Sequence, residues 1–360
     1  MTAPGAVRVM LCDDSPTART AMARVLEADP QLRVVARAGD GRQALEMLGA
    51  LAPEDRPQVM LLDLEMPVMD GMTVLPLLLR AQPRLAVIVA SALTHKGAEA
   101  SMAAMRAGAA DYLPKPGAAG GGVRDPAFQA ELLAKVKGWA RMRTQPPART
   151  VPVRPAVPRA GLAGPRPRAV LVGSSTGGPQ ALAAFVRALR VPPPVPVVVV
   201  QHMPAGFTAM LADHLGRLGG PPAAEARDGE LLQPGRIYLA PGDRHLLVEA
   251  SAAGLVARLN SGPPENFCRP AVDPTLRSLV TACEGRVTAV ILTGMGSDGM
   301  RGCQALAAAG GLVLAQDEAS SVVWGMPGAV AKAGLAQALL PPEQLAERVA
   351  AQFNAMGGAA

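Results

Sequence analysis

In the first half of the chain, the side chains that could do chemistry each stand where an apolar run ends; they are Asp13, Asp14, Asp63, Ser91 and Lys115. Three carboxylates brought together would repel one another unless they shared a divalent cation, and a cluster of hard oxygen ligands suits Mg²⁺. A phosphoryl group could then be transferred to the Asp63 carboxylate, forming a covalent intermediate. The Lys115 ammonium would neutralise charge on the phosphoryl oxygens, and the Ser91 hydroxyl would bond one of them.

The second half offers a serine, a histidine and an aspartate in comparable positions. Ser175 lies in Gly173-x-Ser175-x-Gly177, which has the spacing of a nucleophile elbow between a strand and a helix. His202 and Asp298 each follow an apolar run. His202 would take the proton of the Ser175 hydroxyl, while Asp298 would fix the imidazole tautomer and stabilise its positive form.

A backbone oxyanion hole would complete this arrangement, and the N–H groups of Thr176 and Met295 are its candidates. Simpler interpretations remain open for each motif. The glycine-rich turn could cradle a phosphate or cap a helix, and Asp298 could be a turn residue. His202 could be structural, with His245 as the base instead. In the first half, the aspartate pair could cap a helix and Lys115 could be a solvated loop residue.

These residues need elements to position them, and the first half alternates short β-branched or Leu-rich runs with amphipathic helical stretches. This alternation predicts a parallel sheet wrapped by helices, a (βα)5 flavodoxin-like fold. The polar residues would then share one crevice at the carboxyl edge of the sheet. The expected strands are Val7–Cys12, Arg33–Ala38, Val59–Asp63, Ala86–Ala90 and Asp111–Leu113.

The second half repeats the alternation and predicts another doubly wound, mostly parallel α/β domain. Ser175, His202 and Asp298 would meet at the carboxyl ends of its strands. The expected elements are strands at Ala169–Val172, Val195–Val200 and Thr288–Leu292, and a helix at Gln180–Arg190.

A segment rich in proline and arginine separates the halves. It predicts an extended connector, because proline denies both helix and interior strand. We therefore expect a first domain at 1–140, a linker at 141–167 and a second domain at 168–360. Seven arginines lie at positions 141–168. Because their seven positive charges exceed the formal net charge of +6, the basic character of the chain comes from this segment. The linker has no aromatic residues for base stacking, which argues against nucleic acid as a partner.

Other classes are disfavoured by the absence of their sequence signatures. The four cysteines form no CxxC pair and have no zinc-ligand spacing, so neither a disulfide framework nor a zinc site is expected. No apolar run is long enough to span a bilayer, and the amino terminus does not resemble a signal peptide. We expect a cytoplasmic protein that does not insert into the membrane.

The motifs LCDDSPTAR, LLDLEMPVMDG, VASALT and DYLPKP resemble the response-regulator receiver over roughly the first 120 residues. The resemblance implies that Asp63 is the phosphoacceptor and that Asp13 and Asp14 help it to hold Mg²⁺. It also implies that Ser91 and Lys115 form the switch and that Tyr112 occupies the aromatic switch position.

A second set of motifs, GSSTGGP, VVQHMPAGFT, APGDRH, RPAVD, ILTGMGSDG and VVWGMP, resembles the CheB family of chemotaxis protein-glutamate methylesterases over about residues 168–345. The resemblance implies hydrolysis of glutamate γ-methyl esters on chemoreceptor helices, often with deamidation of glutamines, and no cofactor for hydrolysis. It gives Ser175, His202 and Asp298 the roles of nucleophile, base and orienting acid. The chain departs from the family at Ser174, where many members have Ala, and at Cys268, where a His is common.

Joining the two resemblances gives a phosphorylation-switched serine hydrolase whose phosphodonor is a chemotaxis histidine kinase. The hypothesis is that the unphosphorylated receiver covers the Ser175 crevice and that phosphorylation of Asp63 favours an open state. Two rivals remain at this point. In one, the receiver regulates a phosphate- or nucleotide-binding domain that hydrolyses nothing; in the other, it regulates a DNA-binding domain.

Overall fold

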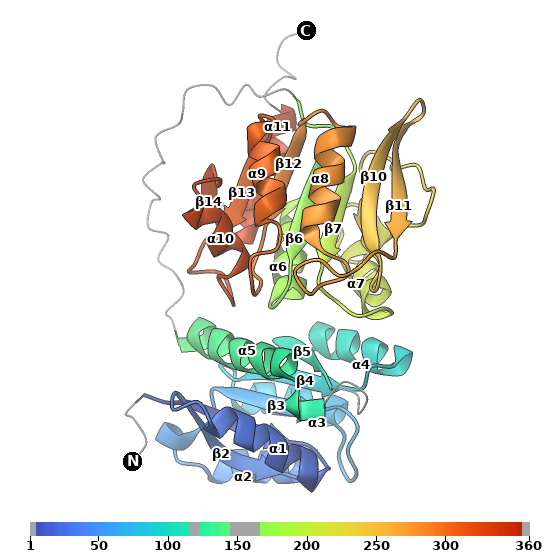
Figure 1. Ribbon diagram of the computed structural model, residues 1–360. Coiled ribbons are helices and arrows are strands. Elements are labelled where there is room, and N and C mark those ends of the chain that lie inside the picture. The colour runs from blue at the N-terminus through green and yellow to red at the C-terminus, as the bar shows by residue number, and fades with distance from the viewer. Residues whose placement is uncertain (1–4, 116–121, 145–165, 355–360) are drawn as a thin grey trace. The chain divides into compact units, whose positions relative to one another are not determined.

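The computed structural model describes residues 5–115, 122–144 and 166–354 (Figure 1). The chain divides into two compact units, Met1–Pro147 and Ala148–Ala360. None of the helices in the described ranges has the length and apolar character needed to cross a membrane.

The first unit is a five-stranded parallel sheet in the order β2-β1-β3-β4-β5. Its strands are β1 (Val7–Cys12), β2 (Leu32–Ala38), β3 (Val59–Asp63), β4 (Ala86–Ser91) and β5 (Asp111–Pro114). All residues of β3 and β4 are buried, as expected for central parallel strands covered on both faces. This is the predicted (βα)5 architecture.

The helices of this unit follow each strand in turn. They are α1 (Pro16–Glu27), α2 (Gly41–Ala50), α3 (Gly71–Ala81), α4 (His95–Arg106) and α5 (Pro126–Thr144), with 3₁₀ turns at Pro53–Asp55 and Gly122–Arg124. The side chains of Ser15, Asp40, Asp70 and Thr94 each accept a backbone N–H in the first turn of the helix that follows. Such caps satisfy donors that have no partner within the helix, so they fix where the helices begin.

Helix α5 continues through Thr144, four residues past the expected end of the receiver at residue 140. Arg141 and Arg143, assigned to the linker from the sequence, lie in its last turn. The first proline of the basic segment is Pro146, so nothing before it opposes a helix. Most of the predicted linker, residues 145–165, lies outside the described residues.

The second unit is built on a seven-stranded parallel sheet in the order β14-β13-β12-β6-β7-β9-β8. Its strands are β6 (Ala169–Ser174), β7 (Val197–Gln201), β8 (Ala223–Glu225), β9 (Ile237–Leu239), β12 (Val287–Ile291), β13 (Leu312–Gln316) and β14 (Ala338–Leu340). An antiparallel hairpin of β10 (His245–Ser251) and β11 (Gly254–Asn260) packs beside it. The second domain is therefore mostly parallel, as predicted.

Helices cover both faces of this sheet (Figure 1). They are α6 (Gly178–Ala188), α7 (Phe207–Gly216), α8 (Val272–Ala282), α9 (Met300–Ala308), α10 (Met326–Lys332) and α11 (Pro342–Asn354). Helix α8 packs against α9, and α6 packs against α11. The core between the sheet, α8, α9 and the hairpin is aliphatic, with Val198, Leu246, Leu276 and Ile291 among its buried members.

The element bounds differ from the sequence predictions by at most two residues. Strand β7 begins at Val197 and not at Val195, because Pro196 has no N–H to donate to a neighbouring strand. Helix α6 begins at Gly178, before Pro179, because proline is well accommodated in a first helical turn. The strand order matters most for function: β12, β6 and β7 are direct neighbours, so their carboxyl ends lie at one edge.

Candidate functional site

The receiver's acidic cluster assembles where β1 and β3 end. One carboxylate oxygen from each of Asp13, Asp14 and Asp63 lies within 4.8 Å of the others. The Nζ atom of Lys115, which follows β5, lies 2.6 Å from Asp63 Oδ2 and 2.9 Å from Asp13 Oδ2. Because every anionic donor is a carboxylate oxygen and one lysine cannot neutralise three of them, the cluster fits a small hard cation such as Mg²⁺.

Burial and charge act in opposite directions on these groups. Burial raises the pKa of Asp63, and the hydrogen bond from Lys115 offsets only part of that increase. Burial alone would lower the pKa of Lys115, but its contacts with Asp63 and Asp13 raise the value overall. Lys115 therefore stays charged at neutral pH and can face an anionic ligand at Asp63.

Two of the three predicted switch residues, Ser91 and Tyr112, have buried partners that the sequence did not reveal. Ser91 Oγ lies 2.6 Å from the hydroxyl of Ser101 on α4, and both side chains are buried. The ring of Tyr112 is buried, with Lys135 Nζ of α5 positioned 4.6 Å from its centroid. Lys135 in turn pairs with Asp111 at 3.2 Å. Neither partner belongs to a recognisable motif, so only packing identifies them.

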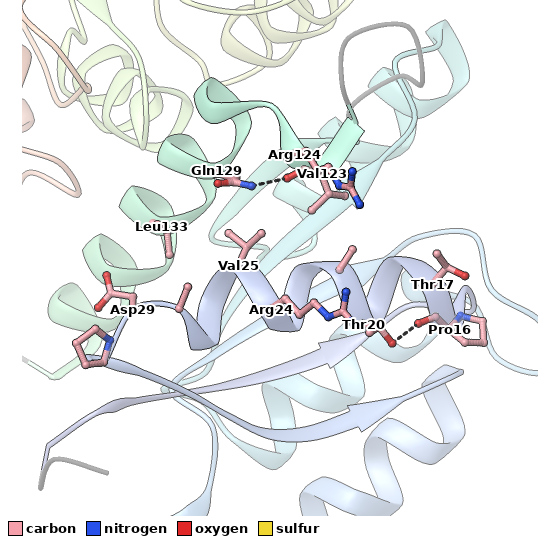
Figure 2. A pocket seen from close by; sticks show the side chains of 13 residues that line it. Pro16, Thr17, Thr20, Arg24, Val25, Asp29, Val123, Arg124, Gln129 and Leu133 are labelled. Carbon is pink, nitrogen blue, oxygen red and sulfur yellow. Dashed lines mark hydrogen bonds between the residues drawn. The ribbon is translucent and has the colours of Figure 1, made fainter. Parts of the chain in front are cut away.

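The receiver also carries a groove of about 1130 Å³ between α1 and α5 (Figure 2). It is lined along α1 by Thr17, Thr20 and Arg24 and on the opposite side by Val123 and Gln129. None of the predicted site residues lines it.

In the second unit, Ser175 lies on the turn between β6 and α6, as the motif predicts. Gly177 caps α6 with φ = 75°, a left-handed conformation that glycine adopts without strain. Gly294, three residues after the end of β12, lies so close that a Cβ there would be 2.8 Å from the Ser175 Cβ. Glycine at 294 thus allows the Asp298 loop to lie directly against the nucleophile turn.

Gln201, the last residue of β7, holds this turn from the other side. Its amide donates to the carbonyl oxygens of Ser175 at 2.9 Å and His202 at 3.1 Å. Its Oε1 accepts the hydroxyl proton of Ser174 at 2.6 Å. The departure from Ala at position 174 therefore adds a buried hydrogen bond and leaves no polar group unpaired.

His202 and Asp298 form the central contact of the site, with Nε2 of the histidine 2.7 Å from Oδ2 of the aspartate. The two side chains are only 11 % and 2 % exposed. Because the carboxylate faces Nε2, the nitrogen available to accept a proton is Nδ1, which lies 3.3 Å from Cys268 Sγ. Within residues 166–354, no hydrogen bond joins the Ser175 hydroxyl to His202. Such bonds commonly form only when substrate binds.

Asp298 is held by backbone donors from two segments, the first turn of α8 and its own loop. Its Oδ2 accepts the N–H of Val272 at 2.6 Å, and its Oδ1 accepts those of Asp273 at 3.0 Å and Gly299 at 2.9 Å. Val272 and Asp273 form the first turn of α8, whose own N-cap, Ala271, has no side chain that can cap it. Asp298 thus caps α8 from a distance, and the helix dipole favours its charged form.

Asn266 was not singled out as a site residue from the sequence, yet its amide bridges two buried carboxylates. It donates to Asp298 Oδ1 at 2.8 Å and to Asp273 Oδ2 at 3.0 Å. Asp273 also accepts the N–H of Gly302 at 2.7 Å, which connects α8 to α9. No sequence signal pointed to this network, because its members are separated by long stretches of chain.

The pKa values of the pair follow from these contacts. Burial by itself lowers the pKa of His202, but its hydrogen bonds to Asp298 and Cys268 outweigh that effect and raise it. For Asp298, burial would raise the pKa, while His202 and the backbone N–H groups of α8 lower it overall. The carboxylate is therefore charged and poised to stabilise a protonated imidazole.

The two proposed oxyanion donors are available. In the part of the second unit that the structure describes, the N–H groups of Thr176 and Met295 donate to no protein acceptor. Thr176 adjoins Ser175 in the turn, and Met295 follows Gly294, which contacts Ser175.

His245, the alternative base, has both ring nitrogens occupied elsewhere. Nε2 contacts the Pro263 carbonyl at 3.0 Å, and Nδ1 accepts the Ala271 N–H at 3.2 Å. These contacts tie His245, the first residue of β10, to the loop before α8, and the geometry favours His202 as the base.

Comparison with known proteins shows which families the two parts of the chain match. A model of the CheB methylesterase family matches residues 170–349, and one of the response regulator receiver domain matches residues 9–121. A Paramagnetospirillum magneticum protein named protein-glutamate methylesterase/protein-glutamine glutaminase 1 is 48 % identical over 371 residues, covering 96 % of this chain and 95 % of that one. An Azospirillum brasilense protein named protein-glutamate methylesterase/protein-glutamine glutaminase is 46 % identical, covering 94 % and 91 %.

Among solved structures, the Thermotoga maritima CheB methylesterase catalytic domain is 42 % identical, with a TM-score of 0.50, and covers 51 % of this chain and 97 % of that one. The two family models and the relatives, which match nearly the whole chain, indicate the same pair of domains, and the Thermotoga maritima structure matches the catalytic domain alone. The chain belongs to the CheB family of receiver-linked protein-glutamate methylesterases.

Proposed function

We propose that Ser175, His202 and Asp298 hydrolyse glutamate γ-methyl esters on the cytoplasmic helices of chemoreceptors, and that the receiver controls this reaction through Asp63. The observation that carries the catalytic assignment is the 2.7 Å contact between His202 and Asp298 beside the Ser175 turn. A domain that only bound phosphate would have no use for a buried histidine–carboxylate pair at this edge.

In the proposed reaction, Ser175 Oγ attacks the ester carbonyl carbon while His202 Nδ1 takes the hydroxyl proton. Asp298 keeps the other ring nitrogen protonated and stabilises the imidazolium that forms. The Thr176 and Met295 N–H groups hold the oxyanion. The intermediate collapses when His202 returns the proton to the methoxy oxygen, and methanol leaves.

Water then attacks the acyl–enzyme, with His202 again acting as base. Proton return to Ser175 Oγ releases the glutamate carboxylate and restores the enzyme. A glutamine side chain would follow the same path with ammonia as leaving group, which accounts for deamidation. Neither reaction calls on a cofactor.

In the receiver, Asp63 accepts a phosphoryl group from a histidine kinase of the same pathway. Mg²⁺ held by Asp13, Asp14 and Asp63 would offset negative charge at this site when bound. Lys115 pairs with the phosphoryl oxygens, and the Ser91 hydroxyl leaves Ser101 to bond one of them. Loss of the Ser91–Ser101 contact and movement of Tyr112 carry the change to the surface of the receiver, which favours an open active site.

The test measures methanol release from a methylated receptor cytoplasmic domain, with and without acetyl phosphate and Mg²⁺. Ser175→Ala should abolish release while leaving the melting temperature and Asp63 phosphorylation unchanged. Ser251→Ala, at the exposed end of the β10–β11 hairpin, is the matched control and should behave like the parent. Asp63→Asn should keep basal release but lose the stimulation. Release by Ser175→Ala, or equal stimulation in Asp63→Asn, would refute the corresponding half of the proposal.

A further inference from the structure

We infer that Phe267, an exposed side chain beside the catalytic residues, is an anchor that contacts the substrate helix next to the scissile ester. This inference rests on the proposed function and adds a residue that selects the protein substrate. Phe267 lies between β11 and α8, and its relative exposure of 103 % means that the protein covers none of its ring.

The backbone at Phe267 is unusual for its residue type. Glu265 and Cys268 exchange two backbone hydrogen bonds of 3.1 and 2.9 Å, which closes a two-residue turn. Both central residues have positive φ, 53° at Asn266 and 62° at Phe267. Asn suits the first position and Gly the second, whereas a bulky side chain rarely adopts this conformation. A strained, fully exposed phenylalanine contributes nothing to folding that glycine would not.

The turn is fixed to the catalytic residues on both sides of Phe267. Asn266 donates to Asp298 Oδ1 at 2.8 Å, and Cys268 Sγ lies 3.3 Å from His202 Nδ1. Glu265 forms a two-point ion pair with Arg277 of α8, at 2.8 and 2.7 Å. Because these contacts hold the backbone of the turn in place, the Phe267 ring can contact a partner at little cost in conformational entropy.

Exposed apolar side chains concentrate at this site. Among residues 166–354, four large hydrophobic residues are exposed: Val191, Phe267, Met295 and Leu339. Phe267 adjoins the two residues that contact Asp298 and His202. Met295, 39 % exposed, follows Gly294, which lies against Ser175. Two of these four exposed residues, Phe267 and Met295, therefore lie beside the predicted triad.

The chemistry of this pair indicates the partner. A methyl ester at one position of a helix has neighbours three and four residues away on the same face. Exposed aromatic and methionine side chains at an interface fit apolar neighbours of that kind. Phe267 therefore contacts apolar side chains of the substrate helix that lie one helical turn away from the esterified glutamate.

The experiment compares Phe267→Gly, Phe267→Leu and the control Val191→Ala in the full chain activated with acetyl phosphate and Mg²⁺. Val191 precedes β7, at the opposite edge of the sheet from His202. For Phe267→Gly, the KM for the methylated receptor domain should rise about tenfold, with kcat within about twofold of the parent. Labelling of Ser175 by a small fluorophosphonate should not slow, and the melting temperature should not fall, because glycine suits φ = 62°.

Phe267→Leu should retain most of the affinity, and Val191→Ala should match the parent. An unchanged KM in Phe267→Gly would overturn the inference. A slowing of fluorophosphonate labelling as large as the loss of activity on the receptor domain would also overturn it, because Phe267 would then act through the triad. If Phe267→Gly instead raised the activity of the unphosphorylated chain at constant KM, the ring would contact the chain's own receiver, which also overturns it. Absence of methanol release by the parent chain would be a failure of the proposed function instead.

Discussion

Replacing Asp298 by asparagine tests the site most directly, because the substitution keeps the shape of the side chain but changes one acceptor into a donor. With the amide nitrogen in place of Oδ2, the Val272 N–H loses its acceptor and His202 faces an N–H donor. With the amide nitrogen in place of Oδ1, the N–H groups of Asn266, Asp273 and Gly299 lose their acceptor. The first orientation leaves fewer buried donors unpaired and should dominate.

This orientation of the asparagine amide determines both the expected loss of stability and the expected loss of kcat. One buried N–H without an acceptor costs about 1–3 kcal/mol, so the free energy of unfolding should fall by about that amount. His202 Nε2 would have to accept from the amide, which places the ring proton on Nδ1, the nitrogen that must take the Ser175 proton. A wrong tautomer of this kind lowers kcat roughly 10³- to 10⁴-fold.

The pH profile gives a second measure of the same change. His202 works as a base only when neutral, and its pKa is raised above 6.5 in the parent. The rising limb of kcat/KM should therefore lie above pH 6.5 in the parent. Because asparagine removes the negative charge that favours the imidazolium, the limb of the residual activity should move to lower pH in Asp298→Asn.

The assay is methanol release from the methylated receptor domain between pH 5 and about 10, a range in which a histidine with a raised pKa loses its proton. Chemical denaturation of each variant is measured in parallel. Ser175→Ala provides the inactive, stably folded reference. The reasoning fails if folded Asp298→Asn retains kcat within about tenfold of the parent, because Asp298 would then not set the tautomer of His202.

Two further predictions concern residues that the sequence did not single out. Asn266→Ala should lower kcat about tenfold and the free energy of unfolding by about 1–3 kcal/mol, because buried Asp273 loses a donor while Asp298 keeps four of its partners. Steady-state kinetics and denaturation would measure this, and unchanged kcat would show that Asn266 does not position Asp298. Ser101→Ala should lower the acetyl phosphate concentration for half-maximal activation about threefold, because one hydrogen bond no longer holds Ser91 away from the phosphoryl group. Thr20→Ala on α1, which removes an exposed hydroxyl bond, is the control, and equal activation curves for all three proteins would argue against a role for Ser101.

The sequence by itself determined the two sheets and the residues at their carboxyl edges. Short apolar runs predicted where strands end, and the topology of parallel sheets then brings those ends together. Asp63 and Lys115 could therefore be paired across 52 positions, and their 2.6 Å contact agrees with that pairing. The glycine spacing around Ser175 identified the turn because few residues tolerate its backbone conformation.

The tertiary structure decided which atoms meet, because that depends on loop paths and side-chain directions that no periodic pattern encodes. The sequence could name His202, but only the fold shows that Nε2 faces Asp298, so that the proposed mechanism must use Nδ1 for the Ser175 proton. Asn266 and Ser101 lie in segments without a motif, and their roles appear only when packing brings them to Asp298 and Ser91. Residue types and spacing thus fixed the chemistry available to this chain, while long-range packing fixed the orientation in which each group can act.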